Sequence, residues 1–507
     1  MTGGRLRGRS FPCCATWLVL AASQSAAFAQ GHEHPVPEKL GTVKFPISCS
    51  ANVQQEFERA VALLHSFAYS AAEKSFRDVL AKDPNCTMAH WGVAMTYFHQ
   101  LWEPYVATQD LARGRAEIDQ AKRLGGSERE REFIEALNTI YANAESVPYR
   151  ERAKAYAEAM AKLAAHNPND VEGHVFYALA LIGTASPTDK SHGNDKKAAD
   201  LLEPLFQKYP QHPGIPHYLI HACDNSGMAR RGRAAAQAYS EIAPSAPHAL
   251  HMPSHIYTRL GMWEQCIASN IAARKAAHVQ GDIGEELHAM DYLTYAYLQL
   301  GREAEAAHVL ADLRELSGLQ PEVFKIGYAA SAMPVRYAVE RRKWSEAAQL
   351  EPLAGTQPHV SAITVWARAI GLARSGNPAA ARRELDQLED TYQKLRESDE
   401  YWAAQVHVQS KEALAWITYA EGKKDDAFKL MRAAADEEDT VEKRPVTPGA
   451  IVPAREQLGD MLLESKRAQD ALSEFEQVLT ATPGRRAALQ GKARANEMME
   501  IPRSGSK

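Results

Sequence analysis

The sequence predicts an all-α protein, a right-handed solenoid in which helical hairpins stack one after another. The chain after residue 47 contains almost no alternating strand pattern. Instead, apolar residues recur at helical spacing in segments of about 12 to 18 residues, separated by Gly, Pro or Asn-Pro. Similar helix–turn junctions recur along the chain, and 507 residues are more than one ordinary core holds.

The N-terminus has the pattern of a secretory signal, which we assign to residues 1–29. Arg5, Arg7 and Arg9 precede the short apolar run "ATWLVLAA", and "AFA" offers small residues for cleavage. The apolar run is too short to span a bilayer, and no later run approaches ~20 apolar residues. We therefore expect an exported protein, periplasmic or secreted, without a transmembrane segment.

The charge balance argues against nucleic acid as a partner. Removal of residues 1–29 takes away three arginines and no acidic residue, so the net charge changes from −5 to −8, with 55 basic and 63 acidic residues. A chain with this excess of acidic residues lacks the basic surface that collects phosphates.

The first hairpin is predicted within "QEFERAVALLHSFAYSAAEKSFRDVLAKDPNC", with a turn near residues 68–70. Ala72, Phe76 and Pro84 follow one another as a small residue, a large residue and a helix stop. Pro210 and Pro244, 34 residues apart, each close an alanine-rich helix. Later turns fall near residues 261, 301, 342, 376, 422 and 466, in steps of 34 to 46.

This pattern resembles the tetratricopeptide-repeat (TPR) superfamily over residues 50–499. The stretches "LLHSFAYSAAEKSF", "DPNCTMAHWGVAM" and "HMPSHIYTRLG" are also similar to a group of large exported bacterial TPR-like proteins. The resemblance implies about eleven degenerate hairpins and a capping helix at 484–499, stabilised mainly by contacts between neighbouring repeats. It assigns no reaction to the chain.

The predicted solenoid divides into three runs of repeats. The N-terminal repeats cover 47–183, the central histidine-rich repeats 198–320 and the C-terminal repeats 321–499. Residues 184–197 and 435–449 read as loops, whereas 30–46 and 500–507 read as a mobile N-terminal segment and a disordered tail.

Five histidines in the central repeats form a candidate metal site. His217 and His221 are four residues apart and would share one helix face; His251 and His255 repeat this spacing one hairpin later, beside His248. Two such pairs on adjacent helices would supply three or four imidazoles to Zn or Cu.

Two features weaken this hypothesis. Pro253 lies between His251 and His255, where it removes a helical hydrogen bond. A kink there would turn the two histidines away from a common helix face. No H-E-x-x-H pattern is present, and Asp224 and Glu241 are acidic candidates only by proximity in sequence. The alternative is that these histidines line the groove, bond to free carbonyls and stack on aromatic rings.

Two cysteines are expected to form a disulfide. Cys49 precedes the first helix and Cys86 opens the third, and antiparallel packing of the first hairpin brings those two ends together. Such a bridge would stabilise the end of the solenoid by ~3 kcal/mol. Cys223 and Cys266 are left unpaired.

Aromatic and histidine side chains are candidates for a peptide-binding groove on the concave face. We assign to it Trp102, Tyr105, Tyr218, Tyr257, His65 and His99. No nucleophile elbow, phosphate loop or dinucleotide motif is present, so we favour a non-enzymatic scaffold that binds a protein or peptide. The competing hypothesis is a Zn- or Cu-binding protein, and self-association stays open.

Overall fold

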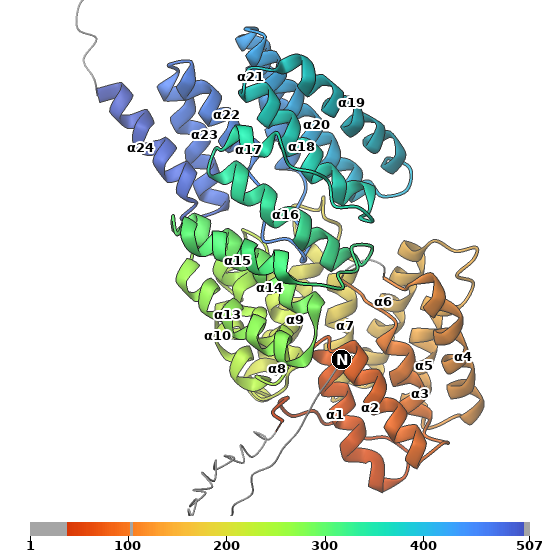
Figure 1. The fold of residues 1–507 in the computed structure, drawn as a ribbon. Helices are drawn as coiled ribbons and strands as arrows, with labels where there is room; N and C mark the ends of the chain where they lie inside the picture. Colours follow the sequence, from red (N-terminus) through yellow and green to blue (C-terminus); the bar gives the residue numbers. More distant parts are fainter. Residues whose placement is uncertain (1–37, 102–104, 501–507) are drawn as a thin grey trace, which may run out of the picture. The chain divides into compact units, whose positions relative to one another are not determined.

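A computed structural model describes residues 38–101 and 105–500 of the chain, and the unit described below begins at Lys39 (Figure 1). Within these residues the regular elements are helices, and no strand occurs. The helices up to residue 259 follow the short 3₁₀ turn Ala51–Val53 and are α1 (Gln54–His65), α2 (Tyr69–Lys82), α3 (Thr87–Thr96), α4 (Thr108–Leu124), α5 (Glu128–Tyr141), α6 (Tyr149–His166), α7 (Val171–Gly183), α8 (Gly193–Lys208), α9 (Gly214–Cys223), α10 (Arg233–Ile242), α11 (Pro247–His251) and α12 (Pro253–Arg259).

The array continues in the same way to residue 500. The remaining helices are α13 (Trp263–Gln280), α14 (Ile283–Gln299), α15 (Glu303–Glu315), α16 (Phe324–Glu340), α17 (Trp344–Ala347), α18 (Pro358–Arg374), α19 (Pro378–Leu395), α20 (Glu400–Ala420), α21 (Lys424–Glu438), α22 (Ala454–Glu464), α23 (Ala468–Ala481) and α24 (Arg486–Glu500). None of the helices in the described residues has the length and hydrophobicity needed to cross a membrane.

Each helix packs on its neighbours in sequence. Contacts join α1 to α2 and α2 to α3, and they also join alternate helices such as α1 and α3, α7 and α9, or α18 and α20. If α11 and α12 are taken as one interrupted helix, the described residues form eleven hairpins and the final helix α24. The predicted all-α helical-repeat fold is confirmed.

The repeat packing depends on a large ring set against a glycine. Phe76 on α2 is fully buried, and its ring lies 2.4 Å from the position that a Cβ at Gly92 would occupy. Near the other end, the Phe475 ring lies 2.3 Å from such a position at Gly491. A side chain at either glycine would displace the ring, so the helices approach closely only because glycine is present.

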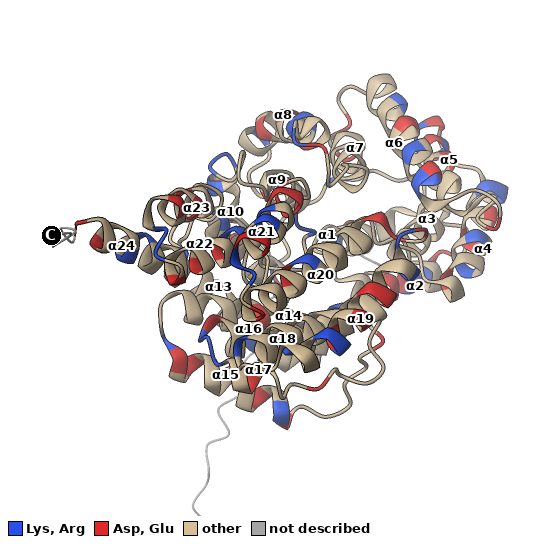
Figure 2. Cartoon of the chain, turned by 90° about the horizontal axis from the view of Figure 1, so that it is seen from above, with Lys and Arg blue, Asp and Glu red and all other residues tan. Residues whose placement is uncertain are grey.

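The buried apolar residues form two clusters that meet at α16. Ile326, Ala329 and Met333 belong to the cluster of the N-terminal and central repeats. Tyr328 and Val335, on the same helix, belong to the cluster of the C-terminal repeats. Charged residues of both signs are interspersed along the helices (Figure 2).

The structure joins Cys49 to Cys86 in a disulfide, and Cys223 and Cys266 are buried free thiols. The segment 30–46 was predicted to be mobile; residues 30–37 lie outside the described residues, but Phe45 is fully buried against Phe57, Trp91 and Phe133. That part of the prediction is wrong because the apolar residues at 40, 43 and 45 cover the start of the array.

Two predicted loops have different bounds in the structure. The loop after α7 ends at residue 192, because α8 already begins at Gly193. The other loop begins later than predicted, since α21 continues to Glu438, and it extends to Pro453. We call residues 439–453 the crossing segment because they contact the central repeats. Of the tail predicted at 500–507, Glu500 ends α24 and residues 501–507 lie outside the described residues, as does the signal at 1–29.

Candidate metal centre

Six buried histidines on four helices lie close together in the central repeats. Their exposed fractions lie between 0% and 6%, and they are His217 and His221 on α9, His248 and His251 on α11, His255 on α12 and His288 on α14. Pro247 begins α11, where its missing N–H would have no partner in any case, and Pro253 begins α12.

The backbone keeps helical angles across the break before Pro253. Met252, between α11 and α12, keeps helical dihedral angles (φ −52°, ψ −36°), and the His255 amide donates to the Met252 carbonyl. His251 and His255 therefore keep a common face, with their Nε2 atoms 3.0 Å apart. The doubt raised by the sequence about this pair is resolved by the backbone around Met252.

Three of these imidazoles form what we call the first trio: His217, His221 and His248. The Nε2 atom of His217 lies 3.1 Å from that of His221 and 3.2 Å from that of His248. The second trio is His251, His255 and His288, and the His251 and His288 ring centres are 4.2 Å apart. In each trio one nitrogen from every ring lies within 4.8 Å of the other two.

The opposite edges of four rings are fixed by acceptors. Nδ1 of His217 donates to the His65 carbonyl (2.5 Å), and Nδ1 of His251 to Asn270 Oδ1 (2.7 Å). Nδ1 of His248 and His255 donate to carboxylates: Glu285 at 3.2 Å and Asp224 at 2.8 Å. Because Nδ1 carries the proton, Nε2 presents a lone pair to its neighbours.

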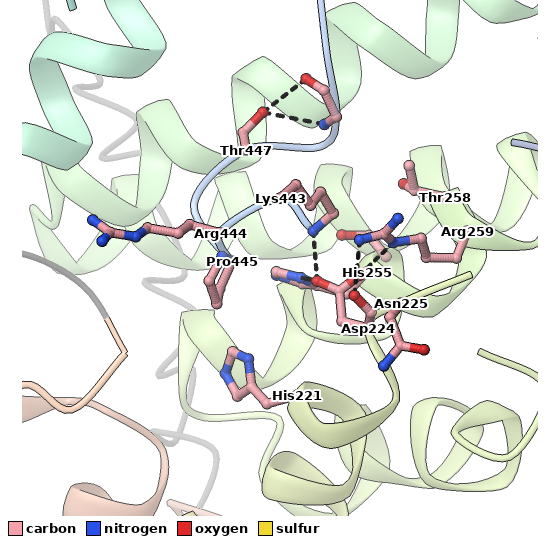
Figure 3. Close-up of polar contacts among 12 residues, drawn as sticks. His221, Asp224, Asn225, His255, Thr258, Arg259, Lys443, Arg444, Pro445 and Thr447 are labelled. Atoms are coloured by element: carbon pink, nitrogen blue, oxygen red, sulfur yellow. Dashed lines mark hydrogen bonds and ion pairs between the residues drawn. The ribbon is translucent and has the colours of Figure 1, made fainter. Parts of the chain in front are cut away.

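These two carboxylates are already paired with cations. Glu285 accepts from Lys325 Nζ at 2.6 Å. Asp224 accepts from Arg259 at 3.0 Å and from Lys443 of the crossing segment at 2.6 Å, as Figure 3 shows. Burial by itself would raise the pKa of Asp224, but Lys443, Arg259 and His255 hold it well below its usual value.

The crossing segment covers this side of the centre. Glu442 accepts from Arg259 Nη2 at 2.6 Å, and the Tyr292 hydroxyl contacts the Pro445 and Thr447 carbonyls at 3.4 and 3.3 Å. Residues more than 180 positions apart thus meet beside His255 (Figure 3). No sequence spacing would have indicated this contact.

Protonation of the imidazoles does not account for the close contacts within the trios. Burial, followed by the neighbouring imidazoles, places the pKa of His217, His221 and His251 well below the ordinary value. Burial also lowers the pKa of His255 to about 4, although Asp224 opposes this. In two pairs of rings, His217 with His248 and His251 with His255, both Nδ1 atoms donate to acceptors. Their Nε2 lone pairs therefore face each other at 3.2 and 3.0 Å, and such contacts are repulsive unless a cation lies between the nitrogens.

The spacing matches the ligand shell of a transition-metal ion. With metal–nitrogen bonds of about 2.0–2.1 Å, two ligands of a tetrahedral ion are about 3.3 Å apart. The facing Nε2 atoms are 3.0–3.2 Å apart. Bonding of Nδ1 to a carboxylate, an amide oxygen or a carbonyl is the usual means of orienting a metal-binding histidine.

A third group, adjacent to the trios, is arranged differently. Glu172 is fully buried and accepts from His65 Nε2 and His212 Nε2, each at 2.8 Å. The second nitrogen of His65 bonds to the Tyr218 hydroxyl, and that of His212 accepts from the Gly214 amide. Each nitrogen of this triad has a complementary partner inside the protein.

The structure separates the residues predicted to line a binding groove. His65 and Tyr218 are fully buried and bonded to each other, so their assignment to an open groove is wrong: the interior polar network needs both. Tyr257 is also buried, at 9% exposed. His99 packs on Tyr69 and Tyr105 stacks on Tyr149, both half-buried, and Trp102 lies outside the described residues.

Sequence reasoning brought five of the six histidines together but missed the groups around them. His288 is not among those five, and Glu285, three residues before it, is not indicated by any motif in the sequence. Asp224 was considered only as a neighbour in sequence. The i−3 spacing of Glu285 and His288 on α14 is the one pattern that could have indicated them.

A separate cavity of about 700 Å³ lies beside the crossing segment. Its wall includes Tyr328, His359, Tyr401 and Trp402 from the C-terminal repeats and Arg259 from α12. It is the hollow with the most aromatic lining found in the described part of the chain.

No protein-family model and no curated protein matches the chain. Solved structures to which it is similar include the Cut9–Hcn1 hetero-tetramer of the APC/C (11% identity, covering 92% of this chain and 79% of that chain, TM-score 0.36). Others are the TPR domain of P58(IPK) (13%, 90% and 100%, 0.22) and yeast Tom70 (10%, 87% and 87%, 0.33). At such low identity and TM-score these similarities assign neither a family nor a function.

Proposed function

We propose that this chain is an exported helical-repeat protein that binds a transition-metal ion, Zn or Cu, in its buried histidine centre. The observation that carries the proposal is the convergence of imidazole nitrogens in both trios, where facing Nε2 atoms lie 3.0–3.2 Å apart. Export is supported by the signal pattern of residues 1–29 and by the Cys49–Cys86 bridge, which suits an oxidising compartment.

The identity of the donors narrows the choice of metal. Imidazole nitrogen suits Zn, Cu, Ni and Fe, whereas Ca²⁺ and Mg²⁺ take oxygen ligands. The two nearest carboxylates, Glu285 and Asp224, bond to imidazole Nδ1 atoms and to Lys or Arg, so they orient the ligands. The site therefore suits an ion that prefers nitrogen ligands.

Elemental analysis of the mature protein, purified without an affinity tag, tests the proposal. We expect near-stoichiometric Zn or Cu, or uptake of either ion by metal-free protein, and loss of that metal in the double variant His217→Ala/His251→Ala. The matched control is His278→Ala/His308→Ala, because those two side chains are 72% and 80% exposed. Wild-type protein that neither contains nor takes up metal would refute the proposal.

The aromatic cavity supports a second candidate function, the binding of a peptide segment. Tyr401 and Trp402 on α20 would supply rigid apolar surface, and Arg259 would supply a charged contact. A photo-cross-linking residue at Gln405, inside the cavity, should form a protein adduct that a residue at the exposed Lys429 does not. Survival of the adduct in Trp402→Ala would exclude the cavity as its site.

A further inference from the structure

The two trios adjoin each other, and this arrangement bears on how many ions the centre holds. The His221 and His255 rings, from different trios, have centres 5.7 Å apart, and those of His248 and His251 are 6.0 Å apart. These separations are similar to those between rings of one trio, such as 5.0 Å for His217 and His248. The trios are thus neighbouring parts of one centre.

Each trio has the same internal design. Each contains one imidazole oriented by a carboxylate, His248 by Glu285 or His255 by Asp224. Each also contains one imidazole oriented by a neutral oxygen, His217 by a carbonyl or His251 by Asn270. In both, a third ring completes a set of three nitrogens within 4.8 Å.

A single bound ion relieves the repulsive nitrogen–nitrogen contacts in only one of the two trios. An ion bound by the first trio would leave the Nε2 atoms of His251 and His255 facing each other at 3.0 Å without a cation. An ion bound by the second trio would leave the Nε2 atoms of His217 and His248 facing each other at 3.2 Å in the same way. Relief of all these contacts requires one cation in each trio.

The charge around the centre favours ions of low charge. All six ligands are uncharged as ligands, and Lys325, Lys443 and Arg259 already neutralise the two carboxylates. Two divalent ions would bring four positive charges into a buried site, and their mutual repulsion would be four times that of two monovalent ions at the same distance. Cu(I) carries one charge and accepts three ligands.

We propose that the centre binds two Cu(I) ions side by side, one coordinated by His217, His221 and His248 and the other by His251, His255 and His288. This inference rests on the proposed metal-binding function and specifies its stoichiometry and its ion. Asn270, Asp224 and Glu285 act as positioning residues through the rings that they orient.

Anaerobic titration of metal-free mature protein with Cu(I), followed by gel filtration and elemental analysis, tests this pairing. We expect two copper ions per chain in the wild type and in the control His278→Ala/His308→Ala. The variants His217→Ala/His248→Ala and His251→Ala/His255→Ala should each retain one. X-ray absorption at the copper edge of the wild type should show three nitrogen ligands per ion.

The outcomes separate the pairing from the broader function. One copper per wild-type chain, or loss of both ions in each variant, would overturn the pairing while leaving a metal-binding protein. Uptake of two Zn(II) but no Cu(I) would overturn the choice of ion, and uptake of no metal would refute both proposals. Circular dichroism shows whether each variant is folded; if one is not, the wild-type stoichiometry and absorption spectrum still decide.

Discussion

The triad of His65, Glu172 and His212 and the two histidine trios are neighbouring groups of buried imidazoles with opposite chemistry. In the triad a carboxylate lies between two rings and accepts from both. In the trios a nitrogen faces a nitrogen, as for His251 and His255 at 3.0 Å. The His65 carbonyl, which accepts from His217, connects the two groups.

The comparison shows two ways in which a group of buried histidines can be stabilised. The triad supplies its own negative charge, and although burial would raise the pKa of Glu172, the adjacent His212 and His65 keep it well below its usual value. The trios have their carboxylates on the outer side, where they orient the rings so that the inner nitrogens face other imidazoles. The first arrangement is complete as a structural element, and the second is completed by a cation.

The largest expected effect is a loss of stability on disruption of the triad. Glu172→Gln leaves two buried imidazole N–H groups without their carboxylate, so we expect the free energy of unfolding of metal-free protein to fall by about 3–5 kcal/mol. Urea denaturation measures it, with the exposed Glu397→Gln as control. A change no larger than the control's would mean that the triad contributes little.

Added metal should distinguish the two groups. At a free Cu(I) concentration of about 100 times Kd, the wild type should gain roughly 2.7 kcal/mol per site in unfolding free energy. Folded Glu172→Gln should keep this gain, since its change lies in the triad, whereas His217→Ala/His251→Ala should lose it. Thermal unfolding with and without copper measures both, and an equal gain in all three proteins would contradict the assignment.

A histidine with neither kind of partner sharpens the comparison. His359 stacks on Trp402 with ring centres 4.4 Å apart, its Nε2 is buried without a hydrogen bond, and burial lowers its pKa to about 4. Below pH 6.5 His359 binds a proton in the unfolded chain but not in the folded chain. The free energy of unfolding therefore decreases as the pH falls from about 6.5 to 4.

The variant His359→Phe should remove this pH dependence while keeping a ring on Trp402. Between pH 7 and pH 5 the loss of unfolding free energy should be about 2 kcal/mol smaller in the variant than in the wild type. Denaturation at the two pH values, with the exposed His308→Phe as control, measures the difference. Equal losses in variant and wild type would mean that His359 titrates normally in the folded protein.

The smallest expected effect concerns the orientation of one ligand. Asp224→Asn keeps the shape of the side chain but weakens its hold on His255 Nδ1, so we expect copper affinity to fall about tenfold. Competition with a chelator measures the affinity, and Asp195→Asn, a change outside the centre, is the control. Unchanged affinity in Asp224→Asn would remove Asp224 from the positioning residues.

The helical periodicity of the sequence predicted most of the fold. The recurring turns and the succession of Ala72, Phe76 and Pro84 are local features, so the repeat pattern was visible in the sequence, and the resemblance that it carries implied the eleven hairpins and the capping helix. The segment 40–45 was misjudged because its burial depends on helices that follow it, among them α5, which carries Phe133.

The candidate site was only partly accessible to the same reasoning. The i, i+4 pairs on α9 and across α11 and α12 lie on common faces, as the helix period dictates. Glu285 and Lys325 are 40 residues apart, and Lys443 is 219 residues from Asp224. Such partners share no pattern along the chain, so no local rule indicates them.

The sequence by itself determined the helical-repeat class, the Cys49–Cys86 pairing and the presence of clustered histidines, because each depends on spacing along one hairpin or between adjacent ones. Only the tertiary structure decided which ring faces a carboxylate and which faces another ring. That choice depends on the return of residues 439–453 to α9 and α12 and on the packing of α14 against α11, where contacts between distant segments set the burial and charge of each nitrogen.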